Sequence, residues 1–261
     1  MTSIRLLMQL ALENNLKVHQ MDVKSAYLNA PIDKEIFVEQ PQGYEIKGKN
    51  NETLVWKLKK SLYGLKQSGR NWNETLNLHL SESELGFKQS MNDPCIYYKK
   101  STFDNSLTYL LTFVDAMLIF AKSESELKQI KTKLNEWFKM KDLGEVKYYL
   151  GIEFNIEHDT ITMSQSKYIE KLLQAFGMKD CKPRYTPCEI NSNKINRDLN
   201  PLDTDDIKTY RQIVGGLIYL MSCTRPDLSF VVTMLSQFMS NPTSGHMTMA
   251  KHVLRYIKGT M

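Results

Sequence analysis

A pair of apolar segments separated by a very short connection limits the possible folds of this chain more than any other feature of its sequence. Residues 106–113 and 117–121 are rich in Leu, Tyr, Thr, Phe and Ile, and Val114-Asp115-Ala116 lies between them. Two such runs predict an antiparallel β-hairpin whose strands are largely buried. Together with the periodic segments around it, the hairpin predicts an α+β core to about residue 164, followed by a helical C-terminal part.

Helical and strand patterns alternate on both sides of the hairpin. Ser3 is predicted to cap a first helix that ends near Asn14-Asn15, and Ser123-x-x-Glu126 is predicted to open another as a capping box. The proline-containing, polar residues 181–208 predict a linker. Further strands are expected at residues 18–23, 36–38, 148–156 and 160–164, and further helices at 67–80, 167–176, 207–222, 226–239 and 245–258.

Composition narrows the classes of function. The 34 Lys+Arg against 29 Asp+Glu leave a net charge of +5, which is compatible with nucleic acid but not specific to it. The four cysteines contain no Cys-x-x-Cys, so we expect no zinc and free thiols in a reducing compartment. Because no signal peptide and no long apolar run is present, we expect an intracellular, cytoplasmic protein with no membrane partner.

Two aspartates lie at points where the predicted strands end. Asp22 ends the strand at residues 18–23, and Asp115 lies in the hairpin turn. Phosphoryl transfer to a nucleotide uses divalent cations held between carboxylates, and adjacent strand ends of one sheet could supply them. Aspartate is also common at strand ends and turns for purely local reasons, and on spacing alone this local explanation is the favoured one.

Motifs along most of the chain occur in an order that resembles copia-type retrotransposon reverse transcriptases. Residues 20–29 are similar to the first catalytic motif of that family, 39–44 to its QPxGF loop, and 58–72 to its LKKSLYGLKQAPRxW motif. The remaining pieces lie at residues 93–97, 113–115, 143–153, 210–220 and 224–227. On these motifs the chain is identified as a member of the family.

The resemblance implies a right-hand polymerase fold, in which an antiparallel palm sheet packs on helices beside partial fingers and a helical thumb. It assigns residues 1–29 to the first part of the palm, 30–66 to partial fingers, 67–157 to the rest of the palm with the catalytic hairpin and a primer-grip-like turn, and 158–261 to a thumb-like region. Family members carry finger strands before the position of Ser3 and a ribonuclease H domain after the thumb. A truncated fragment is therefore expected.

The resemblance also implies a metal site. Asp22 and Asp115 match the family's aspartates that bind two Mg²⁺ ions, with Mn²⁺ as an alternative, and the Val23 backbone carbonyl would help hold one ion. Where the family has Tyr-Val-Asp-Asp, this chain has Phe113-Val114-Asp115-Ala116, so the third acid is replaced by Ala116. Losing even an outer-shell partner of a metal site costs roughly 10–100-fold in affinity or activity, so we expect impaired catalysis.

Further residues are implied to bind the substrates. Tyr27 would clash with a ribose 2′-hydroxyl, Gly64 would let the backbone approach the incoming nucleotide, and Lys66 lies near it. Tyr149, Leu150 and Gly151 would position the primer end. A half-buried strand aromatic and a solvated lysine are the alternative structural explanations for Tyr27 and Lys66. Ser68-Gly69 replaces the family's Ala-Pro, which should loosen that loop.

The sequence therefore predicts a reverse transcriptase domain that adds deoxynucleotides to a primer on an RNA or DNA template, with catalysis impaired by Ala116 and the missing finger strands. A non-catalytic remnant or co-opted fragment that still binds nucleic acid is the alternative. A third interpretation is a soluble interaction domain with no nucleic-acid role. The oligomeric state has no signal in the sequence.

Overall fold

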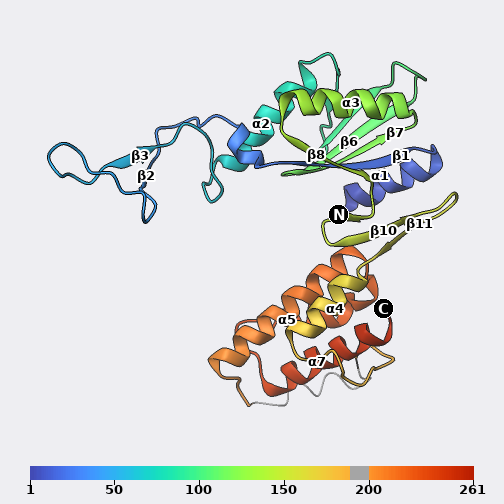
Figure 1. Ribbon diagram of the computed structural model, residues 1–261. Helices are drawn as coiled ribbons and strands as arrows, with labels where there is room; N and C mark the ends of the chain where they lie inside the picture. Colours follow the sequence, from blue (N-terminus) through green and yellow to red (C-terminus); the bar gives the residue numbers. More distant parts are fainter. Residues whose placement is uncertain (189–199) are drawn as a thin grey trace. The chain divides into compact units, whose positions relative to one another are not determined.

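A computed structural model describes residues 1–188 and 200–261 and divides the chain into two compact units. The first unit is Thr2–Val146 and the second is Lys147–Met261 (Figure 1). Residues 189–199 of the predicted linker lie outside the described residues. Among the residues that the structure describes, no helix is long and apolar enough to cross a membrane.

The first unit is built on a six-stranded antiparallel sheet with the strand order β4-β5-β6-β7-β1-β8. The predicted hairpin is confirmed, and it lies inside this sheet, where β5 and β1 flank it. This position explains why the hairpin strands are apolar on both faces. The strands are β1 Lys17–Val23, β4 Lys88–Gln89, β5 Ile96–Lys100, β6 Leu107–Phe113, β7 Ala116–Ala121 and β8 Met140–Glu145.

Helices cover both faces of this sheet (Figure 1). Helix α1 (Thr2–Glu13) lies on one face, and α2 (Ser68–Ser81) and α3 (Glu124–Trp137) lie on the other. Successive side chains of a strand point to opposite faces of a sheet, so β7 contributes side chains to the hydrophobic packing on both faces. It sends Met117, Ile119 and Ala121 into the core that α2 and α3 share, and its alternate residues toward the α1 face.

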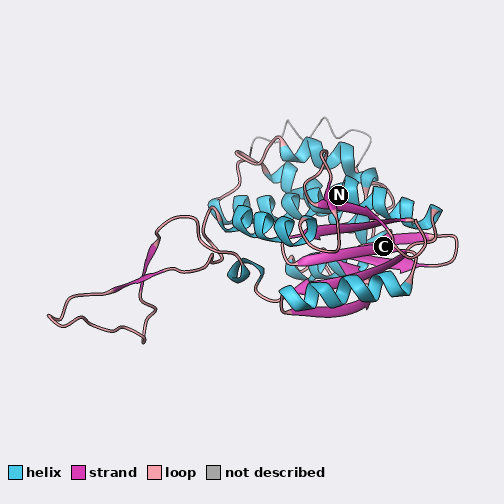
Figure 2. Cartoon of the chain, turned by 90° about the horizontal axis from the view of Figure 1, so that it is seen from above, coloured by secondary structure: helices cyan, strands magenta, loops and turns pink. Residues whose placement is uncertain are grey.

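A long excursion leaves the sheet between the short 3-10 helix η1 (Ala26–Asn29) and α2. Its strands β2 (Phe37–Glu39) and β3 (Val55–Lys57) form a two-stranded antiparallel ribbon, which confirms a strand close to residues 36–38. Figure 2 shows the ribbon extending away from the six-stranded sheet. Large side chains such as Phe37 and Trp56 are exposed on it.

Two predicted helix starts are wrong in detail. Ser3 lies inside α1 rather than before it, and its hydroxyl donates a hydrogen bond to Asp93. Ser123 does cap α3 by accepting a bond from the Ser125 N–H at 3.2 Å. Glu126, however, is buried in an ion pair instead of completing the capping box. In both cases a long-range polar partner competes with the local cap.

The second unit combines a three-stranded antiparallel sheet, ordered β11-β10-β9, with a cluster of helices. The strand predicted at residues 148–156 is wrong as a single element, because a turn at Leu150 and Gly151 divides it. The helix predicted at 226–239 is divided as well. The elements are β9 Tyr148–Tyr149, β10 Ile152–Ile156, β11 Ile161–Ser164, α4 Ser166–Ala175, α5 Thr204–Cys223, η3 Pro226–Leu228, α6 Ser229–Ser236 and α7 Ser244–Gly259.

The helices of the second unit enclose a hydrophobic core of their own. Tyr210, Val232 and Leu254, from α5, α6 and α7, are fully buried in it. The acidic end of the predicted linker belongs to this unit, because the Asp203 side chain caps α5 by accepting a bond from the Asp206 N–H at 2.8 Å. Carboxylates also suit a helix N-terminus electrostatically.

Candidate active site

Asp22 and Asp115 come from neighbouring strands of the six-stranded sheet. Phe113 pairs with Ala116, so Val114 and Asp115 form a two-residue turn between β6 and β7. Ala116 in turn pairs with Asp22 across β1 and β7, which places both side chains on the same face of the sheet. Ala116 is therefore the first residue of β7, not part of the turn to which the sequence pattern assigned it.

The backbone holds the turn against β1. The Val23 N–H donates a hydrogen bond of 2.8 Å to the Asp115 carbonyl oxygen. The residue that follows Asp22 is thus bonded directly to the residue that carries the second carboxylate. The sheet brings the two acids together although they are far apart in sequence.

The two carboxylates interact electrostatically. Burial raises the pKa of Asp22 above its ordinary value, and the negative charge of Asp115 raises it further. Lys141, which pairs with Asp22 across β1 and β8, acts in the opposite direction. A cation beside Asp22 would offset the unfavourable charge that raises its pKa.

We expect the substitution Asp115→Asn to lower the pKa of Asp22, because it removes the like charge and leaves burial in place. Metal binding needs the deprotonated carboxylate, so a lower pKa shifts the onset of any cation binding by Asp22 to lower pH. Carboxyl-carbon NMR titration of Asp22 measures the shift, with Asp142→Asn as a control on β8. An unchanged pKa in Asp115→Asn would show that the two carboxylates do not interact.

An aromatic pair lies next to the acids. Tyr27, in η1, contacts Tyr63 with ring centroids 4.5 Å apart and planes inclined by 38°. Burial and then the charge of Asp115 raise the pKa of the Tyr63 hydroxyl, so this hydroxyl lies within electrostatic reach of Asp115. Tyr63 is still 55% exposed and could contact a ligand. Tyr63 was not predicted as a site residue from the sequence, although it directly precedes Gly64 in the same motif.

Gly64 has a backbone conformation that favours glycine. Its φ of +95° lies in the left-handed region, and among the described residues no heavy atom beyond Gly64 and its two chain neighbours lies within 4 Å of a Cβ built there. The space beside Gly64 is open, as an approaching ligand would require.

Lys66 contributes to a basic pocket of about 310 Å³. Asp33, Lys34, Gln67 and Arg70 complete its lining, so three cationic side chains surround one carboxylate. The pocket is suited to an anionic group.

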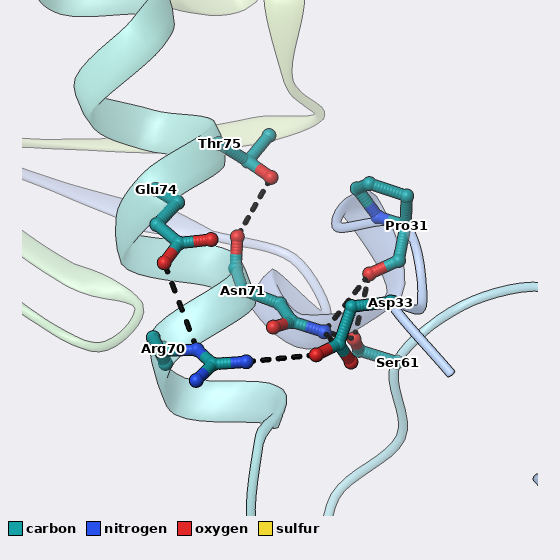
Figure 3. Close-up of polar contacts among 7 residues, drawn as sticks. All are labelled: Pro31, Asp33, Ser61, Arg70, Asn71, Glu74 and Thr75. Atoms are coloured by element: carbon teal, nitrogen blue, oxygen red, sulfur yellow. Dashed lines mark hydrogen bonds and ion pairs between the residues drawn. The ribbon is translucent and has the colours of Figure 1, made fainter.

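A polar network fixes the base of the ribbon excursion against α2 (Figure 3). The Asn71 amide donates to the Pro31 carbonyl and to the Asp33 carboxylate, both at 3.2 Å, and lies 3.3 Å from the Ser61 hydroxyl. Arg70 pairs with the Asp33 carboxylate at 2.7 Å. Pro31 and Ser61 belong to the outgoing and returning segments of the excursion, so Asn71 holds both to the helix beside the basic pocket.

The predicted primer-positioning residues belong to the second unit. Leu150 and Gly151 have φ of +48° and +75°, which is typical of a tight type I′ hairpin turn between β9 and β10. The Tyr219 hydroxyl, on α5, donates to the Leu150 carbonyl, and a Cβ on Gly151 would lie 3.0 Å from that hydroxyl. The Tyr149 side chain is only 1% exposed. Any partner would therefore meet Leu150 and Gly151 rather than the Tyr149 ring.

The donor set limits what the site could hold. Within residues 1–188 and 200–261, no group of three or more His, Cys, Asp or Glu side chains is arranged to hold a metal ion. Asp22 and Asp115 supply two carboxylates. Mg²⁺ usually binds through one or two protein carboxylates together with substrate phosphates, so these residues fit a divalent cation shared with a ligand.

Comparisons with known proteins agree on one family. Residues 1–190 match the family model described as reverse transcriptase (RNA-dependent DNA polymerase). The chain is 38% identical to the retrovirus-related Pol polyprotein from transposon TNT 1-94 of Nicotiana tabacum, over 100% of this chain and 20% of that protein. It is 34% identical to the transposon Ty5-1 protein of Saccharomyces cerevisiae, over 92% of this chain and 76% of that one.

The chain spans about a fifth of the Nicotiana polyprotein. The likeness to one solved structure, the apo telomerase of Candida tropicalis truncated from its C-terminal domain, is slight. Its TM-score is 0.36 at 13% identity, over 62% of this chain and 39% of that one.

Proposed function

The chain belongs to the reverse transcriptase family of RNA-dependent DNA polymerases, and from this premise we propose that it is a polymerase domain with an impaired catalytic site that retains the ability to bind template–primer and deoxynucleotides. The first unit is the palm with part of the fingers. The helices of the second unit are the thumb. The observation that carries the proposal is the pairing of Asp22 with Ala116 beside Asp115.

Asp22, Asp115 and the Val23 backbone carbonyl would hold a divalent cation at this point of the sheet. Members of the family generally use such cations, and Mg²⁺ or Mn²⁺ would neutralise the triphosphate and activate the primer hydroxyl. The negative charge of Asp115, which together with burial raises the pKa of Asp22, supports this assignment, because a bound cation would offset that charge. Ala116 offers no carboxylate for a second ion beside the primer hydroxyl.

The neighbouring residues would bind the nucleotide. The Tyr27–Tyr63 pair would contact the sugar, and the open backbone at Gly64 would lie under the nucleotide. Lys66, in the basic pocket, would attract the phosphates. In the second unit, Leu150 and Gly151 would contact the primer end through their backbone.

Binding of nucleic acid is tested directly by a gel shift with a labelled RNA–DNA primer–template. We expect a complex at low salt whose affinity falls steeply between about 50 and 200 mM salt, because phosphate contacts release counterions. Polyglutamate as competitor controls for non-specific attraction of a polyanion. Primer extension with Mg²⁺ or Mn²⁺ on the same probe measures catalysis.

The outcomes separate the candidate functions. Binding with weak extension supports the impaired polymerase. Binding with no extension by the chain and none by Ala116→Asp supports a non-catalytic remnant, the second candidate, which Ala116 itself favours. No shift at the lowest salt would contradict both.

A further inference from the structure

The turn that carries Asp115 is bonded to a tryptophan on a helix. The indole N–H of Trp72, on α2, donates a hydrogen bond of 2.6 Å to the Val114 carbonyl oxygen. Trp72 is 3% exposed, and its ring packs edge-on against Phe138 with centroids 5.0 Å apart. The donor is therefore held in a fixed orientation by the core.

Val114 is an unfavourable residue for this turn. Its φ is +57°, in the left-handed region, where a β-branched side chain is disfavoured. Two-residue hairpin turns usually place Gly, Asn or Asp at such positions. The conformation of Val114 must therefore be maintained by contacts from outside the turn.

Besides the packing of the Val114 side chain against the core, two hydrogen bonds from outside the turn hold its successive peptide groups. Trp72 binds the carbonyl of Val114, and the backbone N–H of Val23 binds the carbonyl of Asp115. The second bond is formed by the backbone and does not depend on a side chain. The first depends on the Trp72 indole alone.

We propose that Trp72 is a positioning residue for Asp115: its hydrogen bond to Val114 keeps the turn in the conformation that holds the Asp115 carboxylate beside Asp22. The proposal rests on the proposed function only in treating Asp115 as a cation ligand. The positioning of the turn is a separate, purely structural claim. An aromatic ring without the N–H would fill the same core and would not hold the turn.

The test is Trp72→Phe, which keeps a buried aromatic ring and removes the donor. Trp137→Phe is the matched control, because Trp137 packs against the same hydrophobic core from the end of α3. Two quantities are measured on the full chain. One is the hydrogen-exchange rate of the Val23 amide, and the other is the affinity for Mn²⁺, from the electron paramagnetic resonance signal of the free ion.

We expect the Val23 amide to exchange roughly five- to tenfold faster in Trp72→Phe, since the Val114 carbonyl loses its partner and the turn loosens. We expect Mn²⁺ to bind about tenfold more weakly. Trp137→Phe should change neither quantity by a comparable factor. Urea unfolding of both variants gives their free energies of unfolding. It checks that the difference in Val23 exchange is larger than the change in global stability can explain.

Three results decide the matter. If the Val23 amide exchanges at the same rate in Trp72→Phe and in Trp137→Phe, after correction for global stability, the proposal is overturned. Faster exchange with unchanged Mn²⁺ affinity also overturns it, because the indole then does not position Asp115. In the third case the Val23 amide exchanges faster in Trp72→Phe, and the natural chain itself binds no Mn²⁺. This result supports the positioning of the turn by Trp72 and contradicts the proposed cation site.

Discussion

The substitution Ala116→Asp is expected to raise the affinity for Mn²⁺ by about 10–100-fold or more, and to raise primer extension with it. Position 116 pairs with Asp22 and directly follows Asp115, so an added carboxylate would lie on the face of the sheet that carries Asp22. A third carboxylate could bind a second cation directly, whereas Asp22 and Asp115 alone provide too few carboxylate oxygens for two cations. The gain in extension should exceed the gain in cation affinity, because the added ligand serves the ion beside the primer hydroxyl.

The control for this experiment is Leu107→Asp, which adds the same charge at the far end of β6 where the side chain is 44% exposed. Titration with Mn²⁺ followed by resonance of the free ion gives the affinity for all three proteins. If Ala116→Asp and Leu107→Asp bind Mn²⁺ equally, the effect is one of net charge and position 116 has no special relation to the site.

The substitution Glu126→Gln is expected to destabilise the first unit by about 3–5 kcal/mol. Glu126 pairs with Lys99 at 2.6 Å, and the two side chains are 0% and 6% exposed. Ser101 donates to the second carboxylate oxygen at 2.9 Å, and the Lys99 ammonium lies 5.1 Å from the centre of the Phe87 ring. Removing the negative charge leaves the Lys99 cation buried without its partner, which is the costly part of the change.

Urea unfolding measures the free energy of unfolding of Glu126→Gln and of the double variant Lys99→Met/Glu126→Leu. The double variant removes both charges and should be close to the natural chain in stability, because two buried charges and their desolvation are lost together. Lys17→Met, which breaks the exposed pair with Glu124, should change stability very little. A double variant as unstable as Glu126→Gln would mean that packing, not the unpaired charge, causes the loss.

Local patterns predicted most elements of this fold. The apolar hairpin, the strand that ends in Asp22 and the helix that follows Gln67 were predicted within a residue or two of β6, β7, β1 and α2. Such segments succeed because periodicity and short-range propensity agree with burial. The predictions failed where an interaction with a distant residue replaces the expected local one. Glu126 forms a buried ion pair with Lys99 instead of a hydrogen bond to the cap residue Ser123.

The candidate site shows the same division. Asp22, Asp115 and Ala116 were singled out from motifs, because the residues of a motif and their order along the chain are visible in the sequence. The roles of Tyr63 and Trp72 were not, since each depends on a partner from another element: Asp115 lies within electrostatic reach of Tyr63, and Val114 accepts the Trp72 hydrogen bond. The register that places Ala116 opposite Asp22 could not be predicted from the sequence either. A register shifted by one residue would place the side chain of position 116 on the other face of the sheet, away from Asp22.

The family, and the places of Asp22, Asp115 and Ala116 in its motifs, can be read from the amino-acid sequence, because ordered motifs and a missing carboxylate are properties of the chain as written. Which side chains meet depends instead on how the strands pair and how the helices pack on them. The pairing of β1 with β7 aligned Asp22 with position 116, and the packing of α2 on the sheet brought the Trp72 indole to the turn that carries Asp115. Those contacts join residues that are distant in sequence, and no local propensity encodes them.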